Sequence, residues 1–224
     1  MNPLKDMNQF KAVIFDMDGV ISHTNPYHDI AWRQFLQRYN IESSDQEFED
    51  HMYGKHNSYI LNYFFKREIP IVERKKLEFE KEALFREIYA DHVAPIAGLM
   101  NFIENLHMNG IRTGVATSAP VENMQLILPI LGLDNIMGSM LAEGDVTQHK
   151  PEPEVYLKSA INLGVEPENC VVFEDSKSGV QAGINAGMKV VGVKTTYAET
   201  QLPPCNLYIN DYTEIDFEMV NGLF

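Results

Sequence analysis

Positive charge, cysteine and long apolar runs are all scarce in this chain of 224 residues. Lys and Arg number 18 against 32 Asp and Glu, giving a formal net charge of −14, so the surface repels nucleic acid and anionic membranes. The two cysteines are too few for a disulfide framework, and no run approaches the ~18 apolar residues of a membrane helix. An anionic substrate would need a local cation at its site, either a lysine or a bound metal ion.

The first ten residues contain no apolar segment of the kind that signal peptides carry. We therefore expect a cytoplasmic protein that binds neither nucleic acid nor membrane. The acidic surface favours a freely soluble chain, and a monomer is the default expectation.

Apolar runs alternate with segments of helical spacing through most of the chain. The runs predict strands at 12–15, 112–117, 136–141, 170–173 and 189–193. This alternation predicts an α/β fold, a Rossmann-like doubly wound parallel sheet with helices on both faces. Residues 23–93 carry only helical patterns, so we expect a helical cap domain there, inserted into a catalytic core of residues 1–22 and 94–224.

Glycines recur every fourth residue after the predicted strand at 170–173, at Gly179, Gly183 and Gly187. In a soluble chain this spacing is typical of a helix that packs closely against a sheet. We assign these glycines a structural role and no part in ligand binding.

Polar residues follow the predicted strands, at the edge where open parallel sheets bind ligands. They are Asp16 and Asp18 after the first strand, Thr117 and Ser118 after the second, Glu174 and Asp175 after the run C-V-V-F, and Lys150 before a helix. Side chains two apart on extended backbone project to one side, so Asp16 and Asp18 can face one site, and Gly19 permits a sharp exit. Together these residues indicate phosphoryl transfer. They supply carboxylates for Mg²⁺, a lysine and hydroxyls for the phosphate, and a carboxylate that can act as nucleophile.

In this order the motifs resemble the haloacid-dehalogenase-like (HAD) superfamily. The matching segments are D-M-D-G-V at 16–20, Thr117, Lys150 in K-P-E-P-E-V-Y, and F-E-D-S-K-S-G-V-Q-A-G-I-N-A-G-M at 173–188. The helical insertion, with Thr24, His28 and Trp32, resembles the small cap of the β-phosphoglucomutase and phosphatase branch. A lone Asp-x-Asp pair can be a surface turn, and the other three motifs argue against that interpretation.

The resemblance implies that Asp16 is a nucleophile that becomes an aspartyl phosphate, with Mg²⁺ as cofactor. Asp18 would be the acid/base group. Thr117 and Lys150 would hold the phosphoryl oxygens, and Lys150 would keep Asp16 ionised. The implied metal ligands are Asp16, Asp18 (through its backbone carbonyl), Asp175 and, directly or through water, Glu174.

The cap sets the substrate in this superfamily. His28 matches a family histidine near the hinge, and the segment G-K-H-N resembles a cap stretch that reaches the active site, implying substrate contacts for Gly54, Lys55 and Asn57. β-Phosphoglucomutases carry an arginine at the position of Asn57, and Asn cannot supply a bidentate cationic clamp. His23 also departs from the acid common at its position.

We therefore predict a phosphatase acting on a small phosphate ester, phosphosugar-like, or on pyrophosphate. The main alternative is a β-phosphoglucomutase-type mutase. Dehalogenases use an Asp nucleophile without a metal and lack the second acid, so Asp18 counts against them. A non-catalytic phosphate-sensing module has little need for Asp18 or for a cap over 23–93, and this chain has both.

Overall fold

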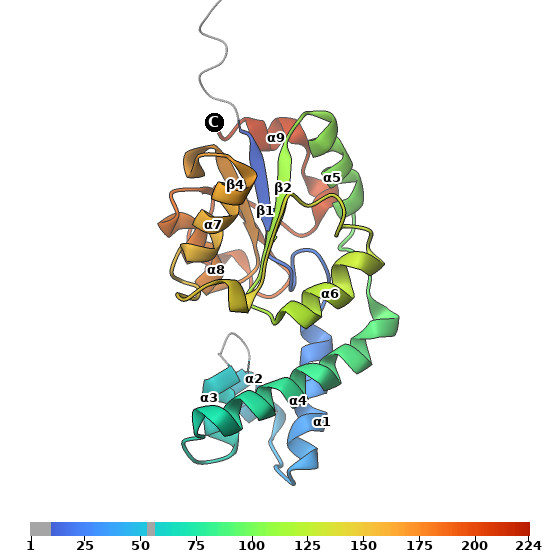
Figure 1. Ribbon diagram of the computed structural model, residues 1–224, viewed down its shortest axis with the longest axis vertical. Coiled ribbons are helices and arrows are strands. Elements are labelled where there is room, and N and C mark those ends of the chain that lie inside the picture. The colour runs from blue at the N-terminus through green and yellow to red at the C-terminus, as the bar shows by residue number, and fades with distance from the viewer. Residues whose placement is uncertain (1–9, 53–56) are drawn as a thin grey trace, which may run out of the picture. The chain divides into compact units, whose positions relative to one another are not determined.

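The computed structural model describes residues 10–52 and 57–224, and these fall into two compact units (Figure 1). One unit contains the chain up to His23 together with Val93–Phe224, and the other contains Thr24–His92. Within the part of the chain that is described, no helix is both long and apolar enough to cross a membrane.

A parallel sheet of six strands forms the centre of the first unit, in the order β3-β2-β1-β4-β5-β6. The strands are β1 Ala12–Phe15, β2 Arg112–Ala116, β3 Ser139–Leu141, β4 Cys170–Glu174, β5 Lys189–Val193 and β6 Leu207–Ile209. Phe15 pairs with Val115 on one side and with Phe173 on the other, so β1, β2 and β4 end at the same edge. The predicted Rossmann-like parallel sheet is confirmed, and β6 is a strand that the sequence pattern did not indicate.

The order of the strands places a topological switch point between β1 and β4. From β1 the chain moves outward to β2 and β3, then returns to the other side of β1 to form β4, β5 and β6. Ligands of open α/β sheets bind in the crevice at such a point, beyond the carboxyl ends of the strands. The residues that follow β1 and β4 are therefore the ones that border this crevice.

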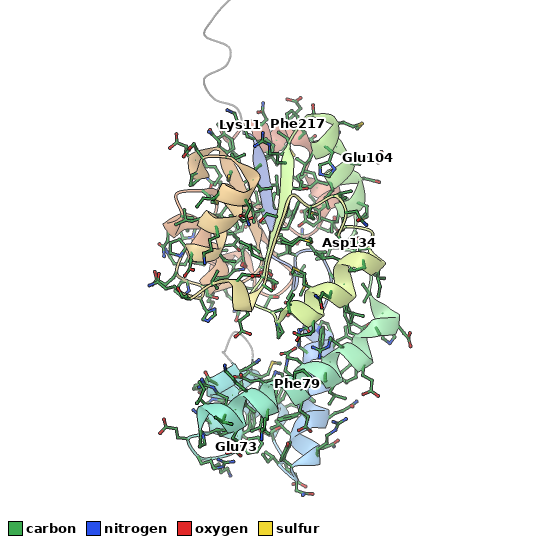
Figure 2. All side chains as sticks on the ribbon, in the orientation of Figure 1. Lys11, Glu73, Phe79, Glu104, Asp134 and Phe217 are labelled. Carbon is green, nitrogen blue, oxygen red and sulfur yellow. The ribbon has the colours of Figure 1, made fainter. Side chains whose placement is uncertain are left out.

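Helices flank the sheet within the same unit. Those in the described part of the chain are α5 Leu99–Met108, α6 Val121–Ile130, α7 Glu154–Leu163, α8 Lys177–Asn185 and α9 Phe217–Asn221. Their apolar positions are mostly buried, while charged residues such as Glu104 of α5 are exposed on the outer side (Figure 2). This separation is the amphipathic pattern that the helical spacing in the sequence predicts.

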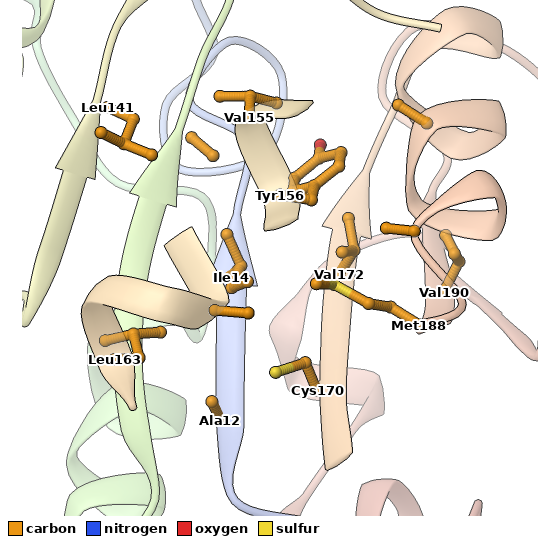
Figure 3. Packing of buried hydrophobic residues seen from close by; sticks show 14 of the residues in the cluster. Ala12, Ile14, Leu141, Val155, Tyr156, Leu163, Cys170, Val172, Met188 and Val190 are labelled. Carbon is orange, nitrogen blue, oxygen red and sulfur yellow. The ribbon is translucent and has the colours of Figure 1, made fainter. Parts of the chain in front are cut away.

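Side chains of β1 alternate between the two faces of the sheet, as the pleat requires. Ile14 packs into a cluster with Tyr156 of α7 and with residues of α8 (Figure 3). Phe15 faces the other way, with the rings of Phe102 and Tyr212 at 6.5 and 6.1 Å between centroids. Both faces of the sheet are therefore apolar and covered, which fixes the strand ends rigidly.

The described residues of the second unit form helices joined by short loops, with no strand among them. Its helices are α1 Asn25–Arg38, α2 Asp45–Met52, α3 Asn57–Phe64 and α4 Ile71–Tyr89. Helix α1 buries Trp32 and Phe35 and packs against α4, where Phe85 is fully buried. These aromatic side chains form a core for the unit.

Candidate active site

The chain leaves β1 through a tight turn that carries the first two predicted acids. Asp16 is only 6% exposed, and Asp18 is half-buried. Gly19 has a φ of +73°, and its N–H donates to the Ser22 carbonyl at 2.9 Å. Because L side chains rarely adopt this left-handed backbone conformation, the turn favours glycine at this position, as expected for the sharp exit after the acids.

Lys150 reaches this turn from the loop that precedes α7. Its Nζ donates to Asp16 Oδ1 at 2.6 Å, to Glu174 Oε1 at 2.8 Å and to the Ala116 carbonyl at 3.1 Å. The lysine is 5% exposed and is shared by two buried carboxylates that follow or end adjacent strands. The structure thus brings together Asp16, Lys150 and Glu174 as the sequence predicts.

A carboxylate at the start of α7 holds the loop that carries Lys150. Glu154 accepts hydrogen bonds from the N–H and hydroxyl of Thr147 and, at 2.7 Å, from the N–H of Gln148. Lys158 and these backbone donors lower the pKa of Glu154 to about 2. The charge of Glu154 therefore stabilises the approach of the loop to the site.

Glu174 is fully buried, and both of its oxygens accept hydrogen bonds inside the protein. Oε1 accepts from Lys150 and, at 2.8 Å, from the hydroxyl of Tyr156. Oε2 accepts from the N–H groups of Asp175 and Ser176 and from the Ser176 hydroxyl, each at 2.9 Å. The carboxylate is locked in one orientation, and its role as a metal ligand stays a prediction.

Two threonines after β5 contact the acid-bearing turns. The hydroxyl of Thr195 donates to the Gly19 carbonyl at 2.6 Å. The hydroxyl of Thr196 donates to Asp175 Oδ2, and Asp175 is 5% exposed. The sequence did not indicate either threonine, because they follow a strand without any recognisable motif.

Thr117 and Ser118 lie just beyond β2, on the strand next to β1. Thr117 is buried, and its Oγ1 accepts the N–H of Ala119 at 3.0 Å. The Thr117 hydroxyl still has its own hydrogen to donate to an anion. Ser118 is exposed.

The electrostatics of this edge are dominated by carboxylates. Burial raises the pKa of Asp16 well above its usual range, Lys150 opposes this, and Glu174, Asp175 and Asp18 raise it further. Burial alone would lower the pKa of Lys150, but the charges of Asp16 and Glu174 hold that pKa well above its usual value. The site therefore carries an excess of negative charge that one lysine does not balance.

The donor chemistry fits the Mg²⁺ ion that the resemblance implies. Asp16, Asp18 and Asp175 offer hard oxygen ligands, and a cation would relieve the repulsion that raises the pKa of Asp16. In residues 10–52 and 57–224, no three His, Cys, Asp or Glu side chains already form a ready-made metal cluster. The site therefore fits Mg²⁺ in the type of its ligand atoms and in its negative charge.

Two of the predicted substrate contacts in the helical insertion, Gly54 and Lys55, lie outside the described residues. His28 lies on α1, with its Nδ1 3.1 Å from Lys81 Nζ. Its ring stacks on Phe85 with 3.7 Å between centroids. The structure therefore places His28 in a packed cluster of the second unit.

Asn57, the last predicted cap contact, belongs to the same cluster. Its Nδ2 lies 3.4 Å from Glu82 Oε1, and the same oxygen lies 2.5 Å from Lys81 Nζ. Lys81 is 1% exposed, and its Nζ lies 5.0 Å from the centre of the Trp32 ring. Lys81 and Glu82 are therefore a buried ion pair, which the sequence did not reveal.

Comparison with known proteins identifies the family of the chain. The family model of haloacid dehalogenase-like hydrolases matches residues 13–193. The chain belongs to this family. The resemblance drawn from the motifs is therefore confirmed, and so is the expectation that the chain is an enzyme of the HAD hydrolase type.

Individual HAD proteins resemble the chain over most of its length. Fructose-1-phosphate phosphatase YqaB of Escherichia coli (strain K12) is 32% identical over 187 residues, 83% of this chain and 97% of that protein. β-Phosphoglucomutase of Bacillus subtilis (strain 168) is 27% identical over 194 residues, 82% of this chain and 83% of that protein. The crystal structure of a HAD hydrolase, family IA, variant 3, from Entamoeba histolytica HM-1:IMSS superposes with a TM-score of 0.90 at 28% identity, covering 95% of this chain and 98% of that one.

Proposed function

We propose that this HAD protein is a Mg²⁺-dependent phosphatase that hydrolyses a small phosphate ester, phosphosugar-like, or pyrophosphate. The observation that carries the proposal is the buried contact between Lys150 Nζ and Asp16 Oδ1 at 2.6 Å, at the carboxyl end of the central strand. A lysine beside a buried carboxylate keeps a nucleophile ionised and offers positive charge to an incoming phosphoryl group.

In the first step an Asp16 carboxylate oxygen attacks the phosphorus atom in line with the leaving oxygen. The bond from phosphorus to the leaving oxygen breaks as the bond to Asp16 forms. Asp18, half-buried and two residues further on, gives its proton to the leaving oxygen. Lys150 and the Thr117 hydroxyl stabilise the phosphoryl oxygens, and a bound Mg²⁺ would supply further positive charge to them.

In the second step water hydrolyses the phosphate ester on Asp16. Asp18, now a carboxylate, accepts a proton from the attacking water. The water oxygen bonds to phosphorus, the bond to Asp16 breaks, and inorganic phosphate leaves. The enzyme returns to its starting state, with Asp16 ionised and Asp18 protonated.

A phosphatase fits the second unit better than a mutase does. A mutase must bind a second, non-reacting phosphate of its intermediate, which calls for a strong cationic clamp. Asn57 supplies no charge, and its amide is directed toward Glu82. Lys81, a buried cation of this cluster, is paired with the same Glu82 carboxylate.

The test is an assay with Mg²⁺ on sugar phosphates, β-glucose 1-phosphate and pyrophosphate, recording both released phosphate and glucose 6-phosphate. We expect phosphate release without isomerisation, and loss of activity when Mg²⁺ is chelated. Formation of glucose 6-phosphate without net loss of phosphate would replace the phosphatase with a mutase.

A further inference from the structure

Lys150 is divided between two carboxylates. Its Nζ lies 2.6 Å from Asp16 and 2.8 Å from Glu174, and all three side chains are buried. Because charge–charge interactions are strong away from water, the negative charge that Glu174 presents decides how firmly Lys150 is held there. Whatever partly neutralises Glu174 makes Lys150 more available to Asp16.

Tyr156 makes such a contact. Its hydroxyl donates at 2.8 Å to Glu174 Oε1, the same oxygen that accepts from Lys150. Lys150 Nζ lies over its ring, 4.8 Å from the ring centre, close enough for a cation–π interaction. Figure 3 shows Tyr156 projecting from α7 into the apolar cluster beside β1, and it is fully buried.

A buried tyrosine hydroxyl needs a hydrogen-bond partner, and a backbone carbonyl would serve that need. Tyr212 illustrates this in the same unit, because its buried hydroxyl donates to the Val20 carbonyl at 3.2 Å. The hydroxyl of Tyr156 instead donates to the side chain that competes with Asp16 for Lys150. Tyr156 therefore touches both the competing acceptor and the lysine itself.

We propose that Tyr156 is a positioning residue, which shares the charge of Glu174 and so leaves Lys150 directed at Asp16 and the phosphoryl group. This inference rests on the proposed phosphatase function. The tyrosine forms no bond to substrate and takes no part in proton transfer. Its effect is transmitted through Glu174 to the lysine.

The experiment compares Tyr156→Phe with Tyr208→Phe. Each change removes one hydroxyl that donates a hydrogen bond within the same unit, but only Tyr156→Phe removes a bond to the lysine's acceptor, because the Tyr208 hydroxyl donates to the Pro203 carbonyl at 3.2 Å. Both variants keep the six-membered aromatic ring, so the change in packing is matched. Inorganic phosphate with Mg²⁺ is titrated into each protein by calorimetry, and kcat and KM are measured for p-nitrophenyl phosphate.

We expect Tyr156→Phe to bind inorganic phosphate about fivefold more weakly than wild type, with kcat/KM lowered by a similar factor, as for the loss of one hydrogen bond. Tyr208→Phe should lower the melting temperature while leaving phosphate affinity and kcat/KM unchanged. If Tyr156→Phe changes only the melting temperature, the tyrosine is a packing residue and the inference is overturned.

A second variant shows whether the effect passes through Glu174. In a Glu174→Gln background there is no carboxylate charge to share, so adding Tyr156→Phe should not weaken phosphate binding further. An undiminished fivefold effect in that background would overturn the inference. A wild-type protein that neither binds phosphate nor hydrolyses an ester would overturn the proposed function itself. If the wild type is active and Tyr156→Phe has the same phosphate affinity and kcat/KM, only the positioning role is overturned.

Discussion

At the scale of single residues, catalysis and folding stability make opposite demands on the ionisation of Asp16. A nucleophile must be ionised, but burial and the carboxylates of Glu174, Asp175 and Asp18 raise the pKa of Asp16. A folded-state pKa above the unfolded one means that ionisation at neutral pH costs folding free energy. The proposed nucleophile is therefore expected to be a destabilising residue in the metal-free protein.

Replacing Asp16 with Asn should separate the two effects. We expect Asp16→Asn to abolish turnover and, in metal-free buffer, to have a higher free energy of unfolding than wild type, because it removes a buried charge that the neighbouring carboxylates repel. Thermal unfolding in chelator and a phosphate-release assay measure both effects, with exposed Asp91→Asn as a control that changes neither. Turnover by Asp16→Asn at the wild-type rate would show that Asp16 is not the nucleophile.

The sequence indicated the residues whose chemistry is unusual for their place. Two acidic residues directly after a buried strand are unusual and indicate a functional site, and Asp16 and Asp18 were found for that reason. Tyr156 and Thr196 were not found, since a tyrosine in a helix is ordinary and Thr196, unlike Thr117, lies outside the motifs that the family resemblance supplied. Their roles depend on hydrogen bonds to Glu174 and Asp175, which lie far away in sequence and become neighbours only in the folded structure.

At the scale of elements, the start of α8 is shaped around Glu174. The four-residue glycine spacing predicts a helix close to the sheet, and Gly183 fits this, since a Cβ there would lie 2.9 Å from Val190 Cγ2. Gly179 has a different neighbour. A Cβ at Gly179 would lie 1.6 Å from Glu174 Oε1, so the carboxylate that holds Lys150 requires a glycine there.

Gly179→Ala should therefore displace the Glu174 carboxylate and, with it, Lys150. We expect kcat/KM to fall about tenfold or more, as when residues that orient a catalytic group are disturbed. Gly144→Ala is the matched control, because a Cβ there meets no atom within 4 Å. Steady-state kinetics compare the two variants. Equal activity of both would mean that the position of Glu174 does not matter to turnover.

The first turn of α7 gives a prediction about acid stability. The pKa of Glu154 is lowered to about 2 from 4.5, so its stabilising effect is present above pH ~4.5 and is lost as the pH falls toward 2. Glu154→Gln should be less stable than wild type at neutral pH and lose less stability over this acid range. Denaturant unfolding at several pH values tests this. Parallel pH profiles for the two proteins would contradict the role of the Glu154 charge.

Elements with a strong pattern were predictable, and weak ones were not. Strands β1, β4 and β5 are dominated by apolar residues, and the structure places them where the sequence predicts them. Strand β6, Leu207–Ile209, has three residues, of which the first two are half-buried, so it has no run long enough to stand out. It is held in place by pairing with β5, a contact that local sequence does not encode.

At the scale of the whole molecule, the net charge of −14 opposes the approach of an anionic substrate. Salt screens this repulsion, so kcat/KM for glycerol phosphate should rise about twofold between ~0.01 and ~0.15 M ionic strength at fixed Mg²⁺. Phosphocholine is the control substrate, since its cationic group should weaken or reverse the trend. If kcat/KM falls with rising ionic strength to the same extent for both substrates, the net charge does not oppose substrate approach.

In the proposed mechanism the phosphoryl group is transferred first to Asp16 and then to water. The most direct test of this transfer is to quench the enzyme with acid during turnover of a radiolabelled phosphate ester and map the labelled peptides. We expect label on the peptide that contains Asp16, and no label on that peptide from Asp16→Asn or from unreacted protein. Rapid phosphate release by wild type with no label on that peptide at any quench time would contradict it.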